Sequence, residues 1–363
     1  MTPFLTIHDT PVYVGRDLLD RVGALVDVRG RVFVITSEAL RDRFGERVAA
    51  SFSPKAEILT VAEGEANKSL ATANDIITQL LERGAKRDSV AVVVGGGMIG
   101  DTAGFAASIF LRGIDLIHVP TTLLAQVDSS IGGKLAVNHP KGKNLIGSFY
   151  PPRAIVSDLS VLDSLPARER LSGLYEALKG GVIADPELFV LFERGNPDVD
   201  DVVRRAIRVK AEIVTTDEKE ADLRRLLNYG HTIAHGIEAA LHYEGITHGE
   251  AVAWGMIGAN AIAVERGLLA PDEATRIDRT ILAYEPTTLP VLDRDQVLAA
   301  TEHDKKNTGT ARVMVFPRRV GECVVVSDVT LEEIAFGFDR VVQTALRQSG
   351  ENSSRGTHNP LSS

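Results

Sequence analysis

Short apolar runs alternate with longer amphipathic stretches through the first half of the chain. Four of them have the length and β-branched content of strands: "RVFVIT" (31–36), "AEILTV" (56–61), "SVAVVVGGG" (89–97) and "DLIHVPTT" (115–122). The first, third and fourth are almost continuously apolar, as expected of strands that are buried on both faces of a parallel sheet. Stretches with helical periodicity, such as residues 69–84, lie between them. This pattern predicts an α/β fold built from βαβ units with right-handed crossovers.

From about residue 160 the spacing of apolar positions becomes helical. The segments "ARERLSGLYEALKGGVIA", "DDVVRRAIRVKAEIVTTDE" and "GEAVAWGMIGANAIAVERG" repeat apolar residues every three or four positions. We therefore expect a parallel-sheet domain over residues 1–160 and an all-helical domain over residues 161–348. The last segment, residues 349–363, is polar and rich in Ser, Gly and Asn, which predicts a disordered tail.

Composition and charge narrow the class of protein. With 363 residues, the chain is too long for one ordinary core, which agrees with two domains. The single cysteine, Cys323, excludes internal disulfides and multi-thiolate zinc sites, and it fits a reducing cytoplasm. The N-terminus has no basic region followed by an apolar one, so we predict no signal peptide, and no apolar run is long enough to cross a membrane.

The net charge of -9 argues against a nucleic-acid surface, which needs a dominant positive field. An anionic small molecule remains possible as a ligand. It would need lysines and arginines that converge locally against the sign of the whole chain.

A glycine-rich loop follows the third predicted strand. Glycines 95, 97 and 100 in "VAVVVGGGMIGDTAG" satisfy the pattern G-x-G-x-x-G, in which backbone N–H groups approach a pyrophosphate at a helix N-terminus. The alternative is an ordinary tight turn, and no clear acidic partner follows about 20 residues later. Because the loop leaves the carboxyl end of a buried strand, where open α/β sheets bind ligands, we favour nucleotide binding.

A polar stripe is expected along one predicted helix over residues 222–241. Its members are spaced four, three and four residues apart, which places them on one face: Arg224, Asn228, His231 and His235. Two histidines at i and i+4, with His248 nearby in sequence, suggest a metal site, and spacing alone favours His231 and His235 as ligands. The alternative is that a histidine on a helix is structural, in the core with a satisfied hydrogen bond. We expect no functional role for His242, which lies in the turn "LHYEG" at the end of the helix. The glutamate of the H-E-x-x-H motif is missing from "HTIAH", which argues against a zinc protease.

A second pair of polar residues interrupts an apolar helix. Glu176 and Lys179 in "LYEALKGG" lie at i and i+3. Taken alone, the pair is better explained as a solvent-facing ion pair than as part of a functional site, and the same caution applies to Lys210 in "RVKAEIV".

Long stretches of the chain resemble the 3-dehydroquinate synthases, from about residue 60 to 330. They are "FLRGIDLIHVPTTLLAQVDSSIGGKLAVNHPKGKNLIGSFYPPRA", "LLNYGHTIAHGIEAA", "THGEAVAWGM" and "DKKNTG". Members of this family join an N-terminal Rossmann-like domain to an all-helical C-terminal domain that binds a metal, with the active site in the cleft. The resemblance implies this α/β architecture here, in a cytoplasmic homodimer.

The resemblance also implies a reaction. The substrate is the seven-carbon sugar acid phosphate DAHP, and the products are 3-dehydroquinate and inorganic phosphate, the second step of the shikimate pathway. Bound NAD oxidises the substrate transiently; phosphate elimination, reduction, ring opening and an intramolecular aldol closure follow. The metal is Zn²⁺, or Co²⁺ in some members.

Roles carry over to individual positions by resemblance. The implied metal ligands are Glu176, His231 and His248, which replaces the pair favoured by spacing. The residues implied to contact the substrate or the reacting carbons are Arg112, Asp128, Lys134, Asn144, Lys179, Lys210, Arg224, Asn228, His235, Lys305 and Lys306. The residues implied to bind NAD are Glu63, Gly64, Glu65, Lys68, Gly97, Met98, Ile99, Gly100, Asp101, Thr121, Thr122, Lys134, Lys143, Val161, Leu162, Asp163 and Ser164.

Three rival functions stay open at this stage. A sedoheptulose 7-phosphate cyclase of the same superfamily is disfavoured by "DSSIGGK". A metal-dependent polyol dehydrogenase would release NADH and would not need the cluster of phosphate-binding cations. A NAD-sensing binding protein would not need to keep Glu176, His231, His248 and Lys179 together.

Overall fold

The computed structural model describes residues 1–217, 223–302 and 312–355 and divides them into two compact units. Among the described residues, unit 1 holds 1–173 and 199–217, and unit 2 holds 174–198 and those from 223 onward. We expected a boundary between residues 160 and 161. This division falls between Gly173 and Leu174, inside one helix, α6 (Ala167–Ile183).

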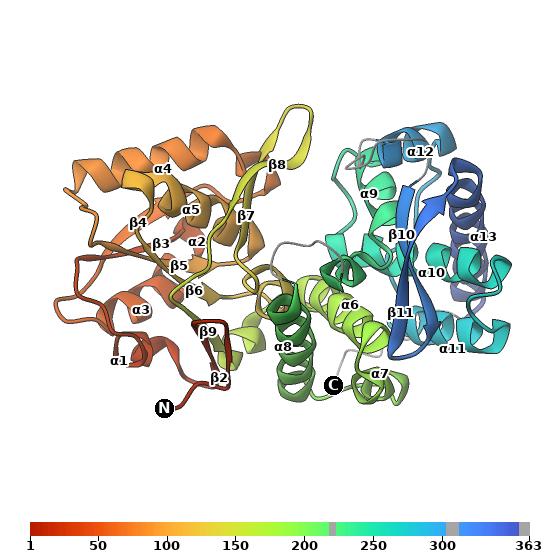
Figure 1. Cartoon of the computed structure of the whole chain (residues 1–363), viewed down its shortest axis with the longest axis horizontal. Helices are drawn as coiled ribbons and strands as arrows, with labels where there is room; N and C mark the ends of the chain where they lie inside the picture. The colour runs from red at the N-terminus through yellow and green to blue at the C-terminus, as the bar shows by residue number, and fades with distance from the viewer. Residues whose placement is uncertain (218–222, 303–311, 356–363) are drawn as a thin grey trace. The chain divides into compact units, whose positions relative to one another are not determined.

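A seven-stranded sheet organises unit 1. Its strands are β1 (Leu5–Ile7), β2 (Thr10–Gly15), β3 (Val32–Ser37), β4 (Glu57–Val61), β5 (Val90–Gly95), β6 (Asp115–Pro120) and β9 (Ala154–Asp158). They lie in the order β1-β2-β9-β6-β5-β3-β4, and neighbouring strands are parallel except for β1 and β2 (Figure 1). The predicted parallel α/β fold is therefore confirmed, and each of the four apolar runs forms a strand.

Helices and a hairpin complete unit 1. The helical elements are η1 (Leu19–Arg21), α1 (Val22–Leu25), α2 (Glu38–Leu40), η2 (Arg41–Gly45), α3 (Glu46–Ala50), η3 (Glu65–Asn67), α4 (Leu70–Glu82), α5 (Gly97–Ile109), η4 (Phe110–Arg112), η5 (Ala125–Ser129), η6 (Leu159–Ser164) and α8 (Val199–Thr216). The hairpin, which the sequence pattern did not predict, pairs β7 (Lys134–His139) with β8 (Gly142–Phe149). Helix α8 belongs to this unit because it packs on η5 and β1.

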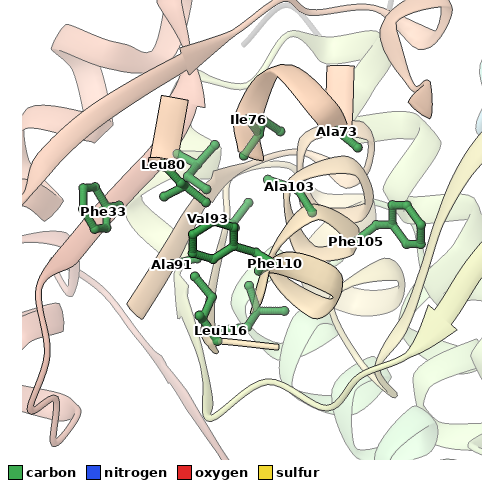
Figure 2. Packing of buried hydrophobic residues seen from close by; sticks show 14 of the residues in the cluster. Phe33, Ala73, Ile76, Leu80, Ala91, Val93, Ala103, Phe105, Phe110 and Leu116 are labelled. Carbon is green, nitrogen blue, oxygen red and sulfur yellow. The ribbon is translucent and has the colours of Figure 1, made fainter. Parts of the chain in front are cut away.

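The core of unit 1 lies between the sheet and the helices α4 and α5 (Figure 2). Alternate residues of a strand point to the same face, so Phe33 and Ile35 of β3 and Ala91 and Val93 of β5 enter this core. The intervening residues of β5, such as Val92, are also buried, on the opposite face. Burial on both faces explains why these strands are almost continuously apolar.

His118 is a titratable group inside this sheet. It lies on β6 with only 4% of its surface exposed, and its Cε1 is 3.8 Å from the point where a Cβ on Gly100 would stand. The imidazole therefore fills the space next to the first turn of α5. Burial lowers the pKa of His118 from 6.5 to about 4, because the charged form would lose its hydration.

Unit 2 is helical, as predicted, with one addition. Beyond its part of α6, its elements are α7 (Pro186–Glu193), η7 (Leu223–Asn228), α9 (His231–Ala240), α10 (His248–Glu265), α11 (Pro271–Leu282), α12 (Arg294–Glu302), β10 (Arg312–Arg319), β11 (Glu322–Val329) and α13 (Leu331–Arg355). The antiparallel hairpin β10–β11 departs from the expected all-helical domain. Helix α13 continues through Arg355, into the segment expected to be a tail.

Helix α10 is the central element of unit 2 and packs against both α9 and α13 (Figure 1). Almost all of its residues from Gly249 to Ala263 are buried, as expected of a helix that is apolar all round. Despite this character, no helix within residues 1–217, 223–302 and 312–355 has the combination of length and hydropathy that a membrane crossing requires.

The predicted continuous helix over residues 222–241 is wrong. The chain forms the short helix η7, breaks, and starts α9 at His231. The break is at Gly230, whose φ of +82° is left-handed. A Cβ there would stand 2.8 Å from Cγ and 2.9 Å from the backbone N of Met256, so α10 approaches too closely for any side chain. Arg224 and Asn228 therefore do not share a helix face with the histidines.

The buried imidazole of His118 predicts a pH dependence of stability. Because the folded state lowers its pKa, its contribution is complete above about pH 6.5 and is lost as the pH falls towards 4. Between pH 7 and pH 5 we expect the unaltered chain to lose about 2 kcal/mol more unfolding free energy than His118→Leu. Denaturant unfolding at both pH values measures this, with the exposed His139→Leu as control. An equal loss in the chain and in His118→Leu would contradict the assignment.

The close approach at Gly230 predicts a specific loss of stability. Gly267 also has a left-handed φ, of +68°, but a Cβ there would meet no atom within 4 Å. Gly267→Ala should therefore cost only backbone strain, about 1–2 kcal/mol. Gly230→Ala should cost about 3 kcal/mol or more, because α10 must also shift. Unfolding free energies of the two variants test this, and equal losses would show that the added methyl group is accommodated.

Candidate functional site

Three side chains of unit 2 converge on one point. Glu176 comes from α6, while His231 and His248 are the first residues of α9 and α10. One ligand atom of each lies within 4.8 Å of the others. The Nε2 atoms of His231 and His248 are 3.8 Å and 3.6 Å from Oε1 of Glu176, whose side chain is 1% exposed. The structure thus brings together the three residues that the resemblance implied as ligands.

The donors in this cluster fit a divalent metal ion. Neither carboxylate oxygen of Glu176 has a hydrogen-bond partner among the described residues, although Nζ of Lys179 forms an ion pair with Oε2. A buried carboxylate in this state is costly unless a cation completes its surroundings. One carboxylate and two imidazoles suit Zn²⁺ or another first-row divalent ion, and three protein ligands leave open positions for a substrate.

The second nitrogen of each imidazole has its own partner. Nδ1 of His231 lies 3.2 Å from the carbonyl oxygen of Tyr229, and Nδ1 of His248 lies 3.3 Å from Oε1 of Glu238. With Nδ1 as the donor in both rings, Nε2 carries the lone pair and faces Glu176. Metal-binding histidines are commonly oriented in this way.

The two histidines experience opposite electrostatic effects. Burial lowers the pKa of His231 well below its usual value, and the nearby Lys179 acts in the same direction. Burial also opposes the charged form of His248, but Glu238 and Glu176 outweigh it and raise its pKa. The carboxylates around His248 account for the difference.

A capping box fixes the start of the helix that carries His248. The backbone N–H of Thr247 donates to Oε2 of Glu250 at 2.8 Å, and Oγ1 of Thr247 accepts from the backbone N–H of Glu250 at 3.4 Å. The hydroxyl of Thr287 donates to the other carboxylate oxygen of Glu250, which is buried. Because both carboxylate oxygens and the backbone N–H of Glu250 form hydrogen bonds, the first turn of α10 has a defined position.

Two further predicted residues lie beside the triad. The ring of His235 lies 5.5 Å from that of His231 and 6.3 Å from that of His248, centroid to centroid. Lys179 is buried and pairs with Glu176.

Arg224 is buried and Asn228 is exposed, and both belong to η7 rather than to α9. Lys305 and Lys306 lie outside the described residues.

In unit 1, the glycine loop lies at the switch point of the sheet. The chain adds β4 on one side of β3 and then returns to place β5 on the other side, and open α/β sheets bind ligands where the order reverses. Gly97 begins α5 directly after β5. A Cβ on Gly96 would stand 3.0 Å from Cγ2 of Thr122, and one on Gly97 would stand 3.0 Å from Oγ of Ser129. The loop is therefore closely packed, and its backbone lies near the end of β6.

Polar side chains from three segments meet near this loop. Nζ of Lys68 is 2.6 Å from Oδ2 of Asp101 and 2.6 Å from Oδ1 of Asn144. Burial raises the pKa of Asp101, against the opposing effect of Lys68. The hairpin β7–β8 also places Nζ of Lys143 3.8 Å from Oε1 of Glu65. Four residues predicted to bind NAD are thus clustered with one that was predicted to bind substrate.

A second lysine–aspartate pair connects α8 to η5. Nζ of Lys210 donates to the backbone oxygen of Asp128 at 2.6 Å and also contacts its carboxylate. Lys210 is buried, so the charge of this lysine is held in a fixed place.

The remaining predicted residues of unit 1 are more dispersed. Glu63 accepts from the hydroxyl of Ser37, and Asp163 is exposed and pairs with Arg16 at 3.0 Å. Arg112 and Lys134 are exposed. The other predicted positions are Gly64 before η3, Met98, Ile99 and Gly100 in the first turn of α5, Thr121 after β6, and Val161, Leu162 and Ser164 in η6.

Two acidic residues near the triad were missed by sequence reasoning. Glu250 had a signal, because Thr247 and Glu250 have the spacing of a capping box. Glu238 follows His231 by seven residues and His235 by three in an otherwise apolar run, so it shares their helix face.

Models of the 3-dehydroquinate synthase family match the chain in two parts. The N-terminal model covers residues 58–172 and the C-terminal model covers residues 173–307, which meet next to the division between the two units. A 3-dehydroquinate synthase of Pelotomaculum thermopropionicum is 42% identical over 357 residues, 93% of this chain and 96% of its own. One from Solibacter usitatus is 41% identical, over 83% of this chain and 87% of its own. The chain belongs to the 3-dehydroquinate synthase family.

Solved structures agree with this family membership. A 2-deoxy-scyllo-inosose synthase complexed with carbaglucose-6-phosphate, NAD⁺ and Co²⁺ has a TM-score of 0.84 at 29% identity, covering 93% of this chain and 98% of that one. ValA, a 2-epi-5-epi-valiolone synthase from Streptomyces hygroscopicus with NAD⁺ and Zn²⁺ bound, has a TM-score of 0.83 at 30% identity, covering 92% and 97%. Glycerol dehydrogenase from Schizosaccharomyces pombe, at a TM-score of 0.65 and 16% identity over 97% and 93%, shares the fold alone.

Proposed function

We propose that this chain converts DAHP to 3-dehydroquinate and inorganic phosphate, as a lyase of the shikimate pathway. The observation that carries the proposal is the convergence of Glu176, His231 and His248 in a chain that is 42% identical to a 3-dehydroquinate synthase over nearly its whole length. A protein that only bound NAD would not need this cluster of donors.

The two sets of residues described above suit the two cofactors of the solved neighbours. Glu176, His231 and His248 would hold Zn²⁺ or Co²⁺. The glycine loop, with Lys68 and Asp101, would hold NAD. The chemistry that the metal would supply is a lower pKa of the alcohol to be oxidised, and the chemistry that NAD would supply is reversible hydride transfer.

Buried cations supply the local positive charge that an anionic substrate needs in a chain of net charge -9. Lys179, Lys210 and Arg224 are each no more than 8% exposed. Lysines and arginines are rarely buried to this degree unless they are paired, and Lys179 and Lys210 lie against the carboxylates of Glu176 and Asp128. We assign them to the phosphate and carboxylate of the substrate, which they would hold in one conformation through the successive steps.

His235 is assigned to hydrogen bonding near the reacting carbons, because its ring is close to both histidine ligands. By resemblance, Asp128 is also assigned to the reacting carbons, and within unit 1 its carboxylate is contacted by Nζ of Lys210. These roles rest on the resemblance together with these contacts.

The rival functions have weaker support. The related cyclases that make valiolone or inosose skeletons are about 30% identical to this chain, against 42% for the 3-dehydroquinate synthase of Pelotomaculum. Glycerol dehydrogenase, at 16% identity, supports only a common fold. We also propose a cytoplasmic homodimer, which agrees with the family and with the single cysteine.

The first test follows the products. Purified protein with DAHP, NAD and Zn²⁺ should release phosphate and form 3-dehydroquinate with no net accumulation of NADH. Phosphate is measured colorimetrically, NADH by absorbance, and the carbocycle by mass spectrometry. Stoichiometric NADH would support the dehydrogenase instead, and tight NAD binding without turnover would support the sensor.

A pair of histidine variants tests the assignment of ligands. His248→Ala should reduce phosphate release to background and lower the zinc content, because one of three ligands is lost. His242→Ala should leave both nearly unchanged, since His242 is exposed in the turn after α9. Comparable losses in the two variants would show that the histidines are misassigned.

A further inference from the structure

We propose that Glu238 is a positioning residue of the metal centre. Its buried carboxylate accepts a hydrogen bond from the Nδ1–H group of His248 and so turns Nε2 of that ring towards the metal. This inference rests on the proposed function, because it takes Glu176, His231 and His248 as metal ligands. Glu238 itself would not touch the metal, the substrate or the cofactor.

The first support is the position of Glu238 relative to the imidazole ring. Oε1 of Glu238 lies 3.3 Å from Nδ1 of His248, while Nε2 of the same ring lies 3.6 Å from Oε1 of Glu176. The two ring nitrogens point in different directions, and a different carboxylate lies next to each. Glu238 therefore contacts the side of the ring that is turned away from the cluster, which excludes it as a fourth ligand of the same ion.

Burial gives the second support. The side chain of Glu238 is only 5% exposed, on a helix whose neighbouring positions are apolar. Glutamate is almost never buried to this extent without a partner, because its charge loses hydration. The Nδ1–H group of His248 supplies a hydrogen bond to this charge, and an ionised acceptor makes a stronger bond than a neutral one.

The third support is the place of Glu238 on α9. His231, His235 and Glu238 occupy positions i, i+4 and i+7, which lie on one helix face. The same helix thus carries one ligand at its first residue and the group that orients the other ligand two turns later. His231 has a backbone carbonyl as its partner, so Glu238 gives His248 a partner of a different kind.

Metal affinity is the direct test, and it does not require turnover. The variants are Glu238→Gln, which keeps an acceptor but removes the charge, and Glu238→Ala, which removes both. Glu244→Gln is the matched control, because Glu244 is an exposed glutamate in the turn after α9. The full-length proteins are freed of metal with a chelator and titrated with Zn²⁺ by calorimetry and with Co²⁺ by visible absorption.

We expect affinity to fall about 10-fold in Glu238→Gln and about 100-fold in Glu238→Ala, the range seen when partners of metal-binding histidines are removed. Glu244→Gln should remain within about twofold of the unaltered chain. The Co²⁺ spectrum should also change in the two Glu238 variants, because His248 is no longer held in one orientation.

A second measurement separates positioning from general stability. Nitrogen-15 labelling of histidine, at a pH high enough to keep the rings neutral, reports which ring nitrogen carries the proton in the metal-free protein. His248 should carry it on Nδ1 in the unaltered chain and become a mixture of tautomers in Glu238→Ala. A purely structural role would lower the melting temperature of the metal-free variants and leave the tautomer of His248 unchanged, which would overturn the proposal.

The possible failures are distinguishable. If the unaltered chain binds metal and Glu238→Ala binds it equally well, Glu238 has no positioning role and the metal centre stands. If the unaltered chain binds neither Zn²⁺ nor Co²⁺, the metal centre is refuted and this inference with it.

Discussion

The carboxylate of Glu176 is the constraint on which the candidate site depends. It lies at 1% exposure without a hydrogen-bond partner in the described part of the chain, and Lys179 is the cation paired with it. Removing a carboxylate from water costs several kcal/mol even after the surroundings relax. A metal ion shared with two imidazoles would offset that cost, so metal binding and the stability of this part of unit 2 should be linked.

The fold supplies each set of functional groups from the ends of rigid elements. In unit 1, the glycine loop follows the carboxyl end of β5, at the reversal of strand order, and Thr121 and Thr122 follow the carboxyl end of β6. In unit 2, both candidate histidine ligands begin helices, and Gly230 and the capping box of Thr247 fix where those helices start. Loops can vary around such positions while the chemical groups remain in register.

Local periodicity explains which parts of this fold could be predicted. The strands β3, β5 and β6 are nearly continuous in apolar residues because both faces are covered, and that signal is present in the chain itself. The break at Gly230 is set by the approach of α10, where a Cβ on Gly255 would stand 2.0 Å from the carbonyl oxygen of Gly230. The spacing of apolar residues along the chain carries no information about such packing between helices. For that reason the predicted helix ran through the glycine.

In the candidate site, too, local spacing predicts some features, while others depend on packing between distant segments. Spacing selected His231 and His235 because neighbours on a helix are visible in sequence. A candidate ligand set that comes from three separate helices, α6, α9 and α10, is not visible in sequence spacing. Its residues were predicted from family resemblance instead. Glu238 could have been suspected from its spacing, but only the fold shows that it meets His248.

Electrostatics give a reason for two carboxylates around one histidine. His231 and His248 each begin a helix, and the N-terminus of a helix carries a partial positive charge that opposes a cation. Lys179 adds a full positive charge nearby. Two helix N-termini and a lysine disfavour a divalent ion at this position, and nearby negative charge offsets that effect. Glu176 supplies the first such charge, and Glu238, across the ring of His248, supplies the second. The sum of these charges, rather than the ligand atoms alone, makes the position suitable for a metal.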